Sequence, residues 1–406
     1  MWFNRKILTR TVLLVSFVSL FTDIASEMLY PVMPVYLKSI GFSILLIGIL
    51  EGVAEATAGL SKGYFGKLSD VWQKRVPFVR AGYIMGVISK PLMAAFTAPV
   101  WIFFVRTLDR FGKGVRTSAR DAMLSDETTP EHKGKVFGFH RSMDTVGAAI
   151  GPVLALIFLW YFPGRYVWMF LLAFFPGLVA IALTFLLKDK VPETKTIRVL
   201  PTANHFSLPS IGFFSYFAYW KKASPGFRYL VSGLLAFTLF NSSDAFLLLA
   251  LKERQLSDTM MIGVYIFYNM VYALFSYPVG ALADKTGLKT MLVAGLVMFS
   301  IVYTGIGFAS TLPVFAILFF MYGLYSACTE GISKALISNM ALKSDTATAI
   351  GFYNSMSSIF TLLASSLAGI LWFAIGSKAM FAISGIGVFL VVCYLVYVFN
   401  VKDKKV

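Results

Sequence analysis

The 406-residue sequence has only 14% charged residues, two cysteines and three histidines. Cys328 and Cys393 both lie inside apolar runs, so we expect no structural disulfide. No Cys/His cluster has the spacing of metal ligands, so we expect no metal site. The segment Arg110-Phe-Gly-Lys-Gly114 lacks the upstream glycine and the Ser/Thr of a phosphate-binding loop. The sequence therefore predicts no cofactor, no ATP-driven machinery and no enzyme.

Apolar residues make up 58% of the chain, against roughly 45–50% in soluble domains. Runs of about 20 apolar residues are long enough to cross a bilayer. The first run follows basic residues, as in a signal peptide, but it is too long for one and contains Asp23 and Glu27. We therefore predict an all-α integral membrane protein whose twelve transmembrane helices lie near 11–36, 44–66, 78–97, 99–122, 135–161, 165–187, 228–251, 260–282, 288–308, 312–339, 347–374 and 378–400.

A net charge of +16 would suit nucleic acid, but its distribution favours a membrane. With the N-terminus inside, most loop Lys and Arg fall on the inner side, and this bias sets membrane topology. The sequence therefore predicts a multi-pass protein of the cytoplasmic (inner) membrane with both termini in the cytoplasm. Its partners would be membrane lipids and a small molecule, not nucleic acid, and we expect a monomer. The outer loops would then hold only Lys38, Arg165, Lys252, Arg254 and Lys378.

A short loop motif occurs twice, 214 positions apart, as Gly66-Lys-Leu-Ser-Asp70 and Gly280-Ala-Leu-Ala-Asp284. Basic residues follow each copy, and each copy lies between two apolar runs. A second match, Gly-Phe-x-x-Ser-Met, occurs at 138–143 and 351–356. The half-chain spacing predicts two parallel repeats of six helices. We expect an N-terminal bundle at 1–187, a linker at 188–227 and a C-terminal bundle at 228–406.

The repeated motif resembles the loop between helices 2 and 3 of the major facilitator superfamily, and the resemblance covers essentially the whole chain. It implies a fold of twelve helices in two pseudo-symmetric bundles and the activity of a secondary transporter. It also implies that the motif aspartate closes the cytoplasmic side by meeting basic residues and a helix end of the other half. The first copy departs from the family pattern at Val71 and Gln73. The gate residues implied by the resemblance are Asp70, Lys74, Arg75, Asp284, Lys285 and Lys289.

The linker contains aromatic residues at helical spacing ahead of two lysines. This pattern predicts an amphipathic helix on the cytoplasmic leaflet. The alternative is a flexible tether that carries aromatic side chains. The residues concerned are Ile211, Phe213, Phe214, Phe217 and Trp220.

The apolar runs of the N-terminal half contain many charges, each of which needs a partner, water or a function. Structural pairing of Arg106 with Asp109 or Glu55, and of Lys90 with Glu51, is one explanation. A transport cavity with ion coupling on one side and apolar substrate contacts on the other is the second. The candidate cavity residues are Asp23, Glu27, Glu51, Glu55, Lys90, Arg106, Asp109, Arg110, His140, Arg141, Asp144, Asn241, Asp244 and Glu330, whereas Lys113, Arg116 and Arg120 are expected to be interfacial anchors.

Asp23 and Glu27 are the preferred coupling pair. They lie one helical turn apart, and like charges so close resist simultaneous ionisation. The family resemblance links a mid-membrane arginine of helix 4 to proton transfer, a role that fits Arg106. Arg110, which replaces the usual glycine, is the residue that would share this role. Gly147, Gly151 and Pro152 in helix 5 resemble the glycine-proline motif of proton-driven exporters, although they also suit ordinary helix packing.

The leading hypothesis is a proton-coupled exporter of a small organic compound that works by alternating access. The second is a proton-driven importer of a charged metabolite or metal chelate such as a siderophore, with Lys90, Arg106, Arg110 and Arg141 holding carboxylate or phosphate groups. A third is a receptor or lipid scramblase on the same fold. Substrate, direction and coupling ion are not determined by residue types, because one fold serves many chemistries.

Overall fold

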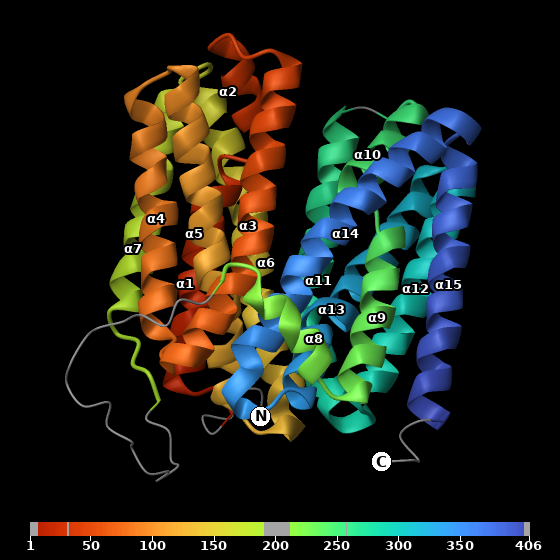
Figure 1. Cartoon of the computed structure of the whole chain (residues 1–406). Coiled ribbons are helices and arrows are strands. Elements are labelled where there is room, and N and C mark those ends of the chain that lie inside the picture. The colour runs from red at the N-terminus through yellow and green to blue at the C-terminus, as the bar shows by residue number, and fades with distance from the viewer. Residues whose placement is uncertain (1–6, 31, 191–211, 257, 402–406) are drawn as a thin grey trace, which may run out of the picture.

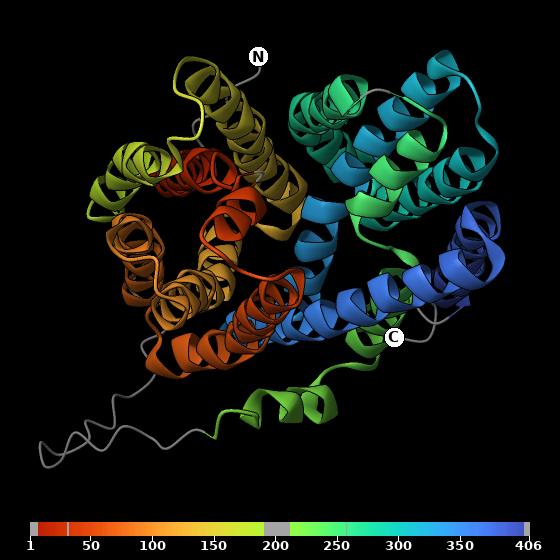
Figure 2. The same ribbon diagram turned by 90° about the horizontal axis from the view of Figure 1, so that it is seen from above.

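The computed structural model describes residues 7–30, 32–190, 212–256 and 258–401, and every regular element in these ranges is helical. The helices form two bundles side by side, α1–α7 and α9–α15 (Figure 1). Viewed along the bundles, each half is a separate group of helices (Figure 2). The first half contains α1 (Arg10–Glu27), α2 (Met33–Ser39), α3 (Ile44–Trp72), α4 (Val76–Ala95), α5 (Pro99–Asp126), α6 (Lys133–Tyr161) and α7 (Tyr166–Thr184).

The second half follows the short helix α8 (Tyr219–Lys222), and its order repeats that of the first. It contains α9 (Pro225–Phe240), α10 (Asp244–Glu253), α11 (Asp258–Thr286), α12 (Leu288–Phe308), α13 (Leu312–Met340), α14 (Thr346–Ile375) and α15 (Ser377–Val401).

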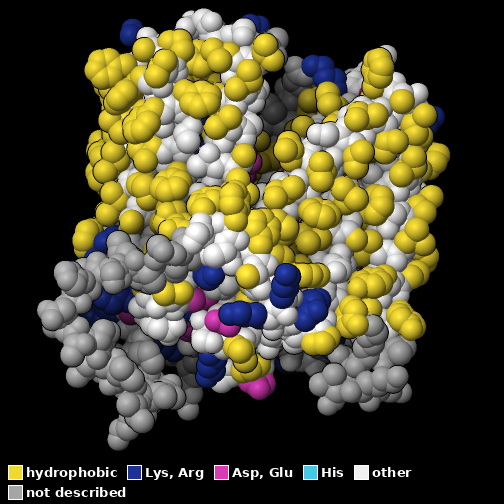
Figure 3. Space-filling model, in the orientation of Figure 1, with side chains coloured by type: hydrophobic (Ala, Val, Ile, Leu, Met, Phe, Trp, Pro, Cys, Tyr) yellow, Lys and Arg dark blue, Asp and Glu magenta, His cyan; other side chains and the backbone are white. Residues whose placement is uncertain are grey.

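The helices are those of a membrane protein. In the described ranges, eight spans are long and apolar enough to cross a bilayer. Helices α1, α3, α4 and α5 have spanning length too, but they carry charged residues. On the face seen in Figure 3, hydrophobic side chains cover much of both bundles, and most of the visible Lys and Arg lie near one end. With α1–α2 and α9–α10 each counted as one span, the bundles supply the predicted twelve transmembrane helices.

Two of the predicted helices are interrupted. The run at 11–36 is divided between α1, which ends at Glu27, and α2, which begins at Met33. The run at 228–251 breaks between Phe240 and Asp244, where Ser243 caps α10 by accepting a hydrogen bond from the Ala245 N–H. Uninterrupted helices at these two places were wrong predictions. Hydropathy does not register such breaks, because the residues on both sides are apolar.

The end of the molecule that carries both loop motifs, 66–75 and 280–289, is called here the motif side, and the other end the open side. On the motif side, α3 packs against α14 and α6 against α11. Glycines permit these close contacts: a Cβ at Gly66 would lie 2.4 Å from the Ala347 carbonyl oxygen, and one at Gly280 would lie 2.2 Å from the Gly134 carbonyl oxygen. The two equivalent crossings bring the halves together at this end.

The described part of the linker bridges the same crossing. The Tyr216 hydroxyl lies 2.8 Å from the Ser355 hydroxyl of α14, and Lys67 of α3 donates to the Ser215 carbonyl at 3.1 Å. Trp220 stacks on Phe352. The boundaries at 188–227 and the placement on a membrane surface stay predictions, and Ile211 lies outside the described residues.

Candidate functional site

A cavity of about 400 Å³ lies between the halves. Its walls come from α1, α3, α5 and α6 on one side and from α9 and α11–α14 on the other. The space-filling view shows the molecule hollowed between the bundles on the open side (Figure 3). A smaller pocket of about 50 Å³ lies deeper in the first half and shares Asp23, Glu27, Lys113 and Arg116 with the cavity wall.

Asp70 joins the two halves on the motif side. Its carboxylate accepts hydrogen bonds from the Ala347 N–H at 3.3 Å and from the Thr348 N–H and hydroxyl at 2.6 Å each. These amides belong to the first turn of α14, whose free N–H groups attract an anion. Arg75 forms a 2.5 Å ion pair with the same carboxylate. Asp70 is only 3% exposed, so this contact is shielded from water.

Asp284 makes the equivalent contact in the other direction. Its carboxylate accepts hydrogen bonds from the Gly134 N–H at 2.8 Å and the Lys135 N–H at 3.0 Å, in the first turn of α6. Each motif aspartate therefore caps a helix of the opposite half. The motif glycine lies one turn earlier on the same helix and allows the approach. The structure thus shows a molecule closed on the motif side.

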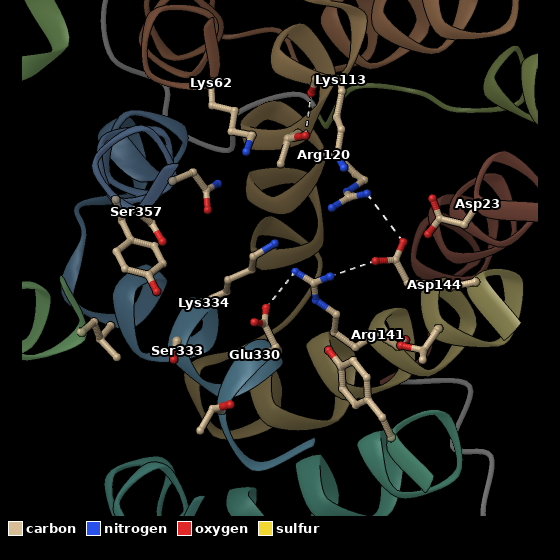
Figure 4. Close-up of a pocket in the computed structure, with 18 of the residues that line it drawn as sticks. Asp23, Lys62, Lys113, Arg120, Arg141, Asp144, Glu330, Ser333, Lys334 and Ser357 are labelled. Atoms are coloured by element: carbon tan, nitrogen blue, oxygen red, sulfur yellow. Dashed lines mark hydrogen bonds and ion pairs between the residues drawn. The ribbon is translucent and has the colours of Figure 1, made fainter. Parts of the chain in front are cut away.

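Two carboxyl groups meet in the cavity wall where α1 contacts α6. The carboxyl groups of Asp23 and Asp144 face each other across this contact (Figure 4). Asp144 also accepts from Arg141 at 2.9 Å and lies 3.9 Å from Arg120. No basic nitrogen of the described residues lies within 4.0 Å of the Asp23 carboxyl group. The negative charge of Asp144 is therefore balanced by arginines, whereas that of an ionised Asp23 would not be.

Ion pairs connect this region to the second half. Arg141 reaches Glu330 of α13 at 3.4 Å while it holds Asp144 (Figure 4). Beside it, Lys334 of α13 lies 2.6 Å from the fully buried Asp121 of α5. Arg120 completes that cluster at 3.0 Å from Asp121. The Arg141–Glu330 and Lys334–Asp121 ion pairs cross the boundary between the halves.

A second ion network lies within the first half. It confirms the predicted pair of Arg106 with Asp109 and corrects the partner predicted for Lys90. Lys90 pairs with Asp109 at 2.9 Å and not with Glu51. Arg106 pairs with Glu51 at 2.8 Å and with Asp109 at 3.4 Å. Arg110 lies 3.8 Å from Glu55. Lys90, Arg106, Arg110 and Arg141 all have carboxylate partners, so they are not the free anion-binding groups that the importer hypothesis assumed.

The predicted anchors were placed wrongly. Lys113, Arg116 and Arg120 line the cavity and do not lie at the interface. Lys62 of α3 also lines it and was missed, although it lies seven residues beyond Glu55 and therefore on the same helical face. That spacing was the available signal.

Besides the six residues of the second ion network, three further candidates lie outside the cavity wall. The His140 ring bonds the Ser19 hydroxyl at 3.0 Å between α6 and α1. The Asp244 carboxylate accepts hydrogen bonds from the hydroxyls of Tyr322, at 2.7 Å, and Tyr268. Asn241, in the break between α9 and α10, donates to the Tyr325 hydroxyl at 3.2 Å. These residues belong to hydrogen-bonding clusters inside one half each.

Comparison with known proteins identifies the fold. The Major Facilitator Superfamily model matches residues 15–270 and 229–406. An uncharacterized MFS-type transporter of Methanocaldococcus jannaschii is 31% identical over 375 residues, which cover 91% of this chain and 90% of the relative. This chain belongs to the major facilitator superfamily.

Other members are more distant. The multi-drug resistance efflux pump PmrA of Streptococcus pneumoniae is 23% identical over 335 residues, 79% of each protein. The crystal structure of the human organic anion transporter MFSD10 superposes with a TM-score of 0.77 at 16% identity, over 95% of this chain and 99% of that one. At this identity the likeness shows a shared fold.

The remaining motif residues of this superfamily member differ in their surroundings. Lys74 bonds Ser69 through its backbone, and Lys289 lies over the Phe399 ring at 5.2 Å. Lys285, at the end of α11, has no ion pair within 4.0 Å among the described residues. Arg75 makes a direct contact with a motif aspartate, Asp70.

The glycine-proline motif of the fifth predicted span lies on α6 of the structure, where this helix crosses α1. A Cβ at Gly147 would lie 2.5 Å from the Leu20 carbonyl oxygen, and one at Gly151 would lie 2.7 Å from the Met28 nitrogen. The two glycines thus let α6 approach α1, which places Asp144 against Asp23. Pro152 lies inside α6 just beyond this crossing.

Proposed function

We propose that this superfamily member is a proton-coupled transporter that exports a small organic compound across the cytoplasmic membrane in exchange for protons. The motif side faces the cytoplasm in this proposal. The structure then corresponds to the state in which the cavity is accessible from outside and the cytoplasmic gate is closed. Rocking of the two bundles about the cavity would alternate access.

The carboxyl pair of Asp23 and Asp144 is the observation that carries the proposal. Two ionised carboxylates that face each other in a poorly hydrated wall disfavour each other's charge, so one of the two is expected to hold a proton. Arg141 and Arg120 neutralise Asp144, which leaves Asp23 as the member that holds the proton. A proton-binding group in the wall of the transport cavity is what coupling requires.

The ion pairs across the halves supply a link between this proton and the gate. In the state closed on the motif side, Arg141 forms ion pairs with both Asp144 and Glu330. Opening the motif side would separate α6 from α13 and remove Glu330 from Arg141. The full guanidinium charge would then act on the carboxyl pair and favour loss of its proton. Protons would be taken up on the open side and released on the motif side.

Export is supported by the relative PmrA, which is named an efflux pump. The positive charges on the motif side support its placement in the cytoplasm (Figure 3). An importer could use the same carboxyl pair, with substrate and proton moving in one direction. In export by exchange the proton moves opposite to the substrate, whereas in symport the two move in the same direction.

The deciding experiment is transport in proteoliposomes with a pH-sensitive dye in the lumen. A compound panel is loaded inside and an inward proton gradient is imposed. Export by exchange predicts that substrate efflux speeds acidification of the lumen. Acidification when the compound is added outside would indicate symport instead. Transport with no pH change, whatever the gradient, would contradict proton coupling.

A further inference from the structure

Three basic side chains line the cavity without a carboxylate partner. Lys62, Lys113 and Arg116 have no carboxylate oxygen within 4.0 Å among the described residues. Lys62 has one weak polar contact, a 3.3 Å hydrogen bond to the Ser358 hydroxyl. Arg116 lies over the Tyr83 ring at 4.3 Å. Lys62 and Lys113 point into the cavity from two helices, α3 and α5 (Figure 4).

The same wall contains hydrogen-bond donors that have no acceptor. Among its buried polar atoms, Arg116 Nε, Arg141 Nε, Asn354 Nδ2 and the Tyr272 hydroxyl make no hydrogen bond in the structure. Arg116 is only 7% exposed, so its free N–H is a costly group to leave unpaired. The cavity therefore offers donors and positive charge, and an occupant has to supply acceptors.

The charges of the wall do not cancel. Arg120 and Lys334 are held by Asp121, while Arg141 is held by Asp144 and Glu330. The remaining acids of the wall are Asp23 and Glu27, and under the proposed function Asp23 carries a proton. Three free cations then face one free carboxylate, which leaves an excess of two positive charges.

Part of the wall on the second half is apolar. This part, called here the apolar wall, is formed by side chains of α9 and α12: Leu234, Phe237, Leu292 and Leu296. A cavity of about 400 Å³ has the size of a small-molecule site. The preferred occupant is a compact molecule with charge at one end and carbon at the other.

From these features we infer that the substrate is a small organic anion with two or more negative charges, carried by carboxylate or phosphate groups. Lys62, Lys113 and Arg116 bind the anionic groups, and Asn354 donates to them from the second half. The apolar wall contacts the carbon skeleton. This inference rests on the proposed function and names its substrate class.

The test is a binding measurement on the purified full chain in detergent, at fixed pH and ionic strength and with no gradient. The probes are citrate for carboxylates, glycerol 3-phosphate for phosphates, glycerol as the uncharged match and tetraphenylphosphonium as the cation. Saturable binding is followed by calorimetry and by the thermal unfolding midpoint. We expect citrate or glycerol 3-phosphate to bind and stabilise the protein, and glycerol and the cation to do neither. The anion that binds tells which acidic group is recognised.

Variants locate the site. Lys62→Gln and Lys113→Gln should each weaken anion binding about tenfold or more, since a hydrogen bond to a charged group is worth about 1.5–3 kcal/mol. Lys62→Arg keeps the charge and should retain most of the affinity, which separates lost charge from misfolding. Lys38→Gln on α2, exposed and outside the cavity wall, is the matched control and should bind normally.

Absence of binding by both anions, binding of the cation instead, or unchanged affinity in both glutamine variants would overturn the inference. These outcomes are separable from the proposed function. Anion binding without proton-linked transport would retain the substrate class and refute coupling. Proton-linked transport of neutral or cationic compounds alone would support proton coupling and refute the anionic substrate class.

Discussion

Asp70 and Thr348 lie 278 positions apart in the chain, yet the Asp70 carboxylate accepts a 2.6 Å hydrogen bond from the Thr348 backbone N–H. This bond joins the end of α3 to the start of α14 and thus one half to the other. Asp284 repeats it between α11 and α6. The duplicated sequence motif therefore corresponds to a duplicated contact that closes one end of the cavity.

We expect Asp70→Asn to shift the population toward a state open on the motif side. Asparagine keeps the shape but loses the charge that binds the α14 amides and Arg75, so the shift should be about tenfold or more. Asp284→Asn should act more weakly, because Asp284 has two backbone donors and, among the described residues, no arginine partner at ion-pair distance. Distances between spin labels on the two halves measure the population.

Ser224→Ala is the control for these gate variants. Ser224 caps α9 within one half, so its loss should lower stability by about 1 kcal/mol without opening the gate. Turnover should fall more than substrate affinity in the aspartate variants. A double variant with wild-type transport and label distances would refute the gate role.

Gly66→Ala and Gly280→Ala should also open the motif side. The added Cβ would lie 2.4 Å and 2.2 Å from carbonyl oxygens of the other half, so the helices must separate. Overpacking of this kind costs about 1–3 kcal/mol. Gly48→Ala on α3 and Gly263→Ala on α11 are matched controls, since no atom of the described part of the chain lies within 4 Å of a Cβ at either site. Equal label distances in all four variants would show that the close crossings do not hold the gate.

The sequence allowed the spans and the contacts of the two motif aspartates with the opposite half to be predicted, because apolar runs and a repeated motif are local features. It did not reveal which carboxylates pair, since Lys90 meets Asp109 and not Glu51 only through the packing of α4 on α5. The position of Lys62 and Lys113 in the cavity wall likewise depends on how the helices pack. Helical spacing shows that residues share a face, but the tertiary fold decides whether that face meets lipid, protein or water.

Topology can be tested by single cysteines in a background that lacks Cys328 and Cys393. Lys38 on α2 and Lys222 on α8 lie at opposite ends of the bundles (Figure 1). The proposed orientation predicts that Lys222→Cys is labelled only from the cytoplasm and Lys38→Cys only from outside, by a membrane-impermeant maleimide. Labelling of both from the same side would contradict the arrangement of the spans, and reversed labelling would contradict the orientation.

Asp23→Asn tests the central claim, that the carboxyl pair couples transport to protons. Asparagine can donate to Asp144 as a protonated Asp23 would, so the variant should fold and imitate the protonated state. It should lose accumulation driven by a pH gradient and keep exchange of labelled for unlabelled substrate at equal pH. Glu131→Gln, an exposed carboxylate outside the cavity, should keep both activities. The decisive measurement is gradient-driven accumulation by Asp23→Asn in proteoliposomes: the proposed coupling predicts none, and accumulation with the wild-type pH dependence would contradict it.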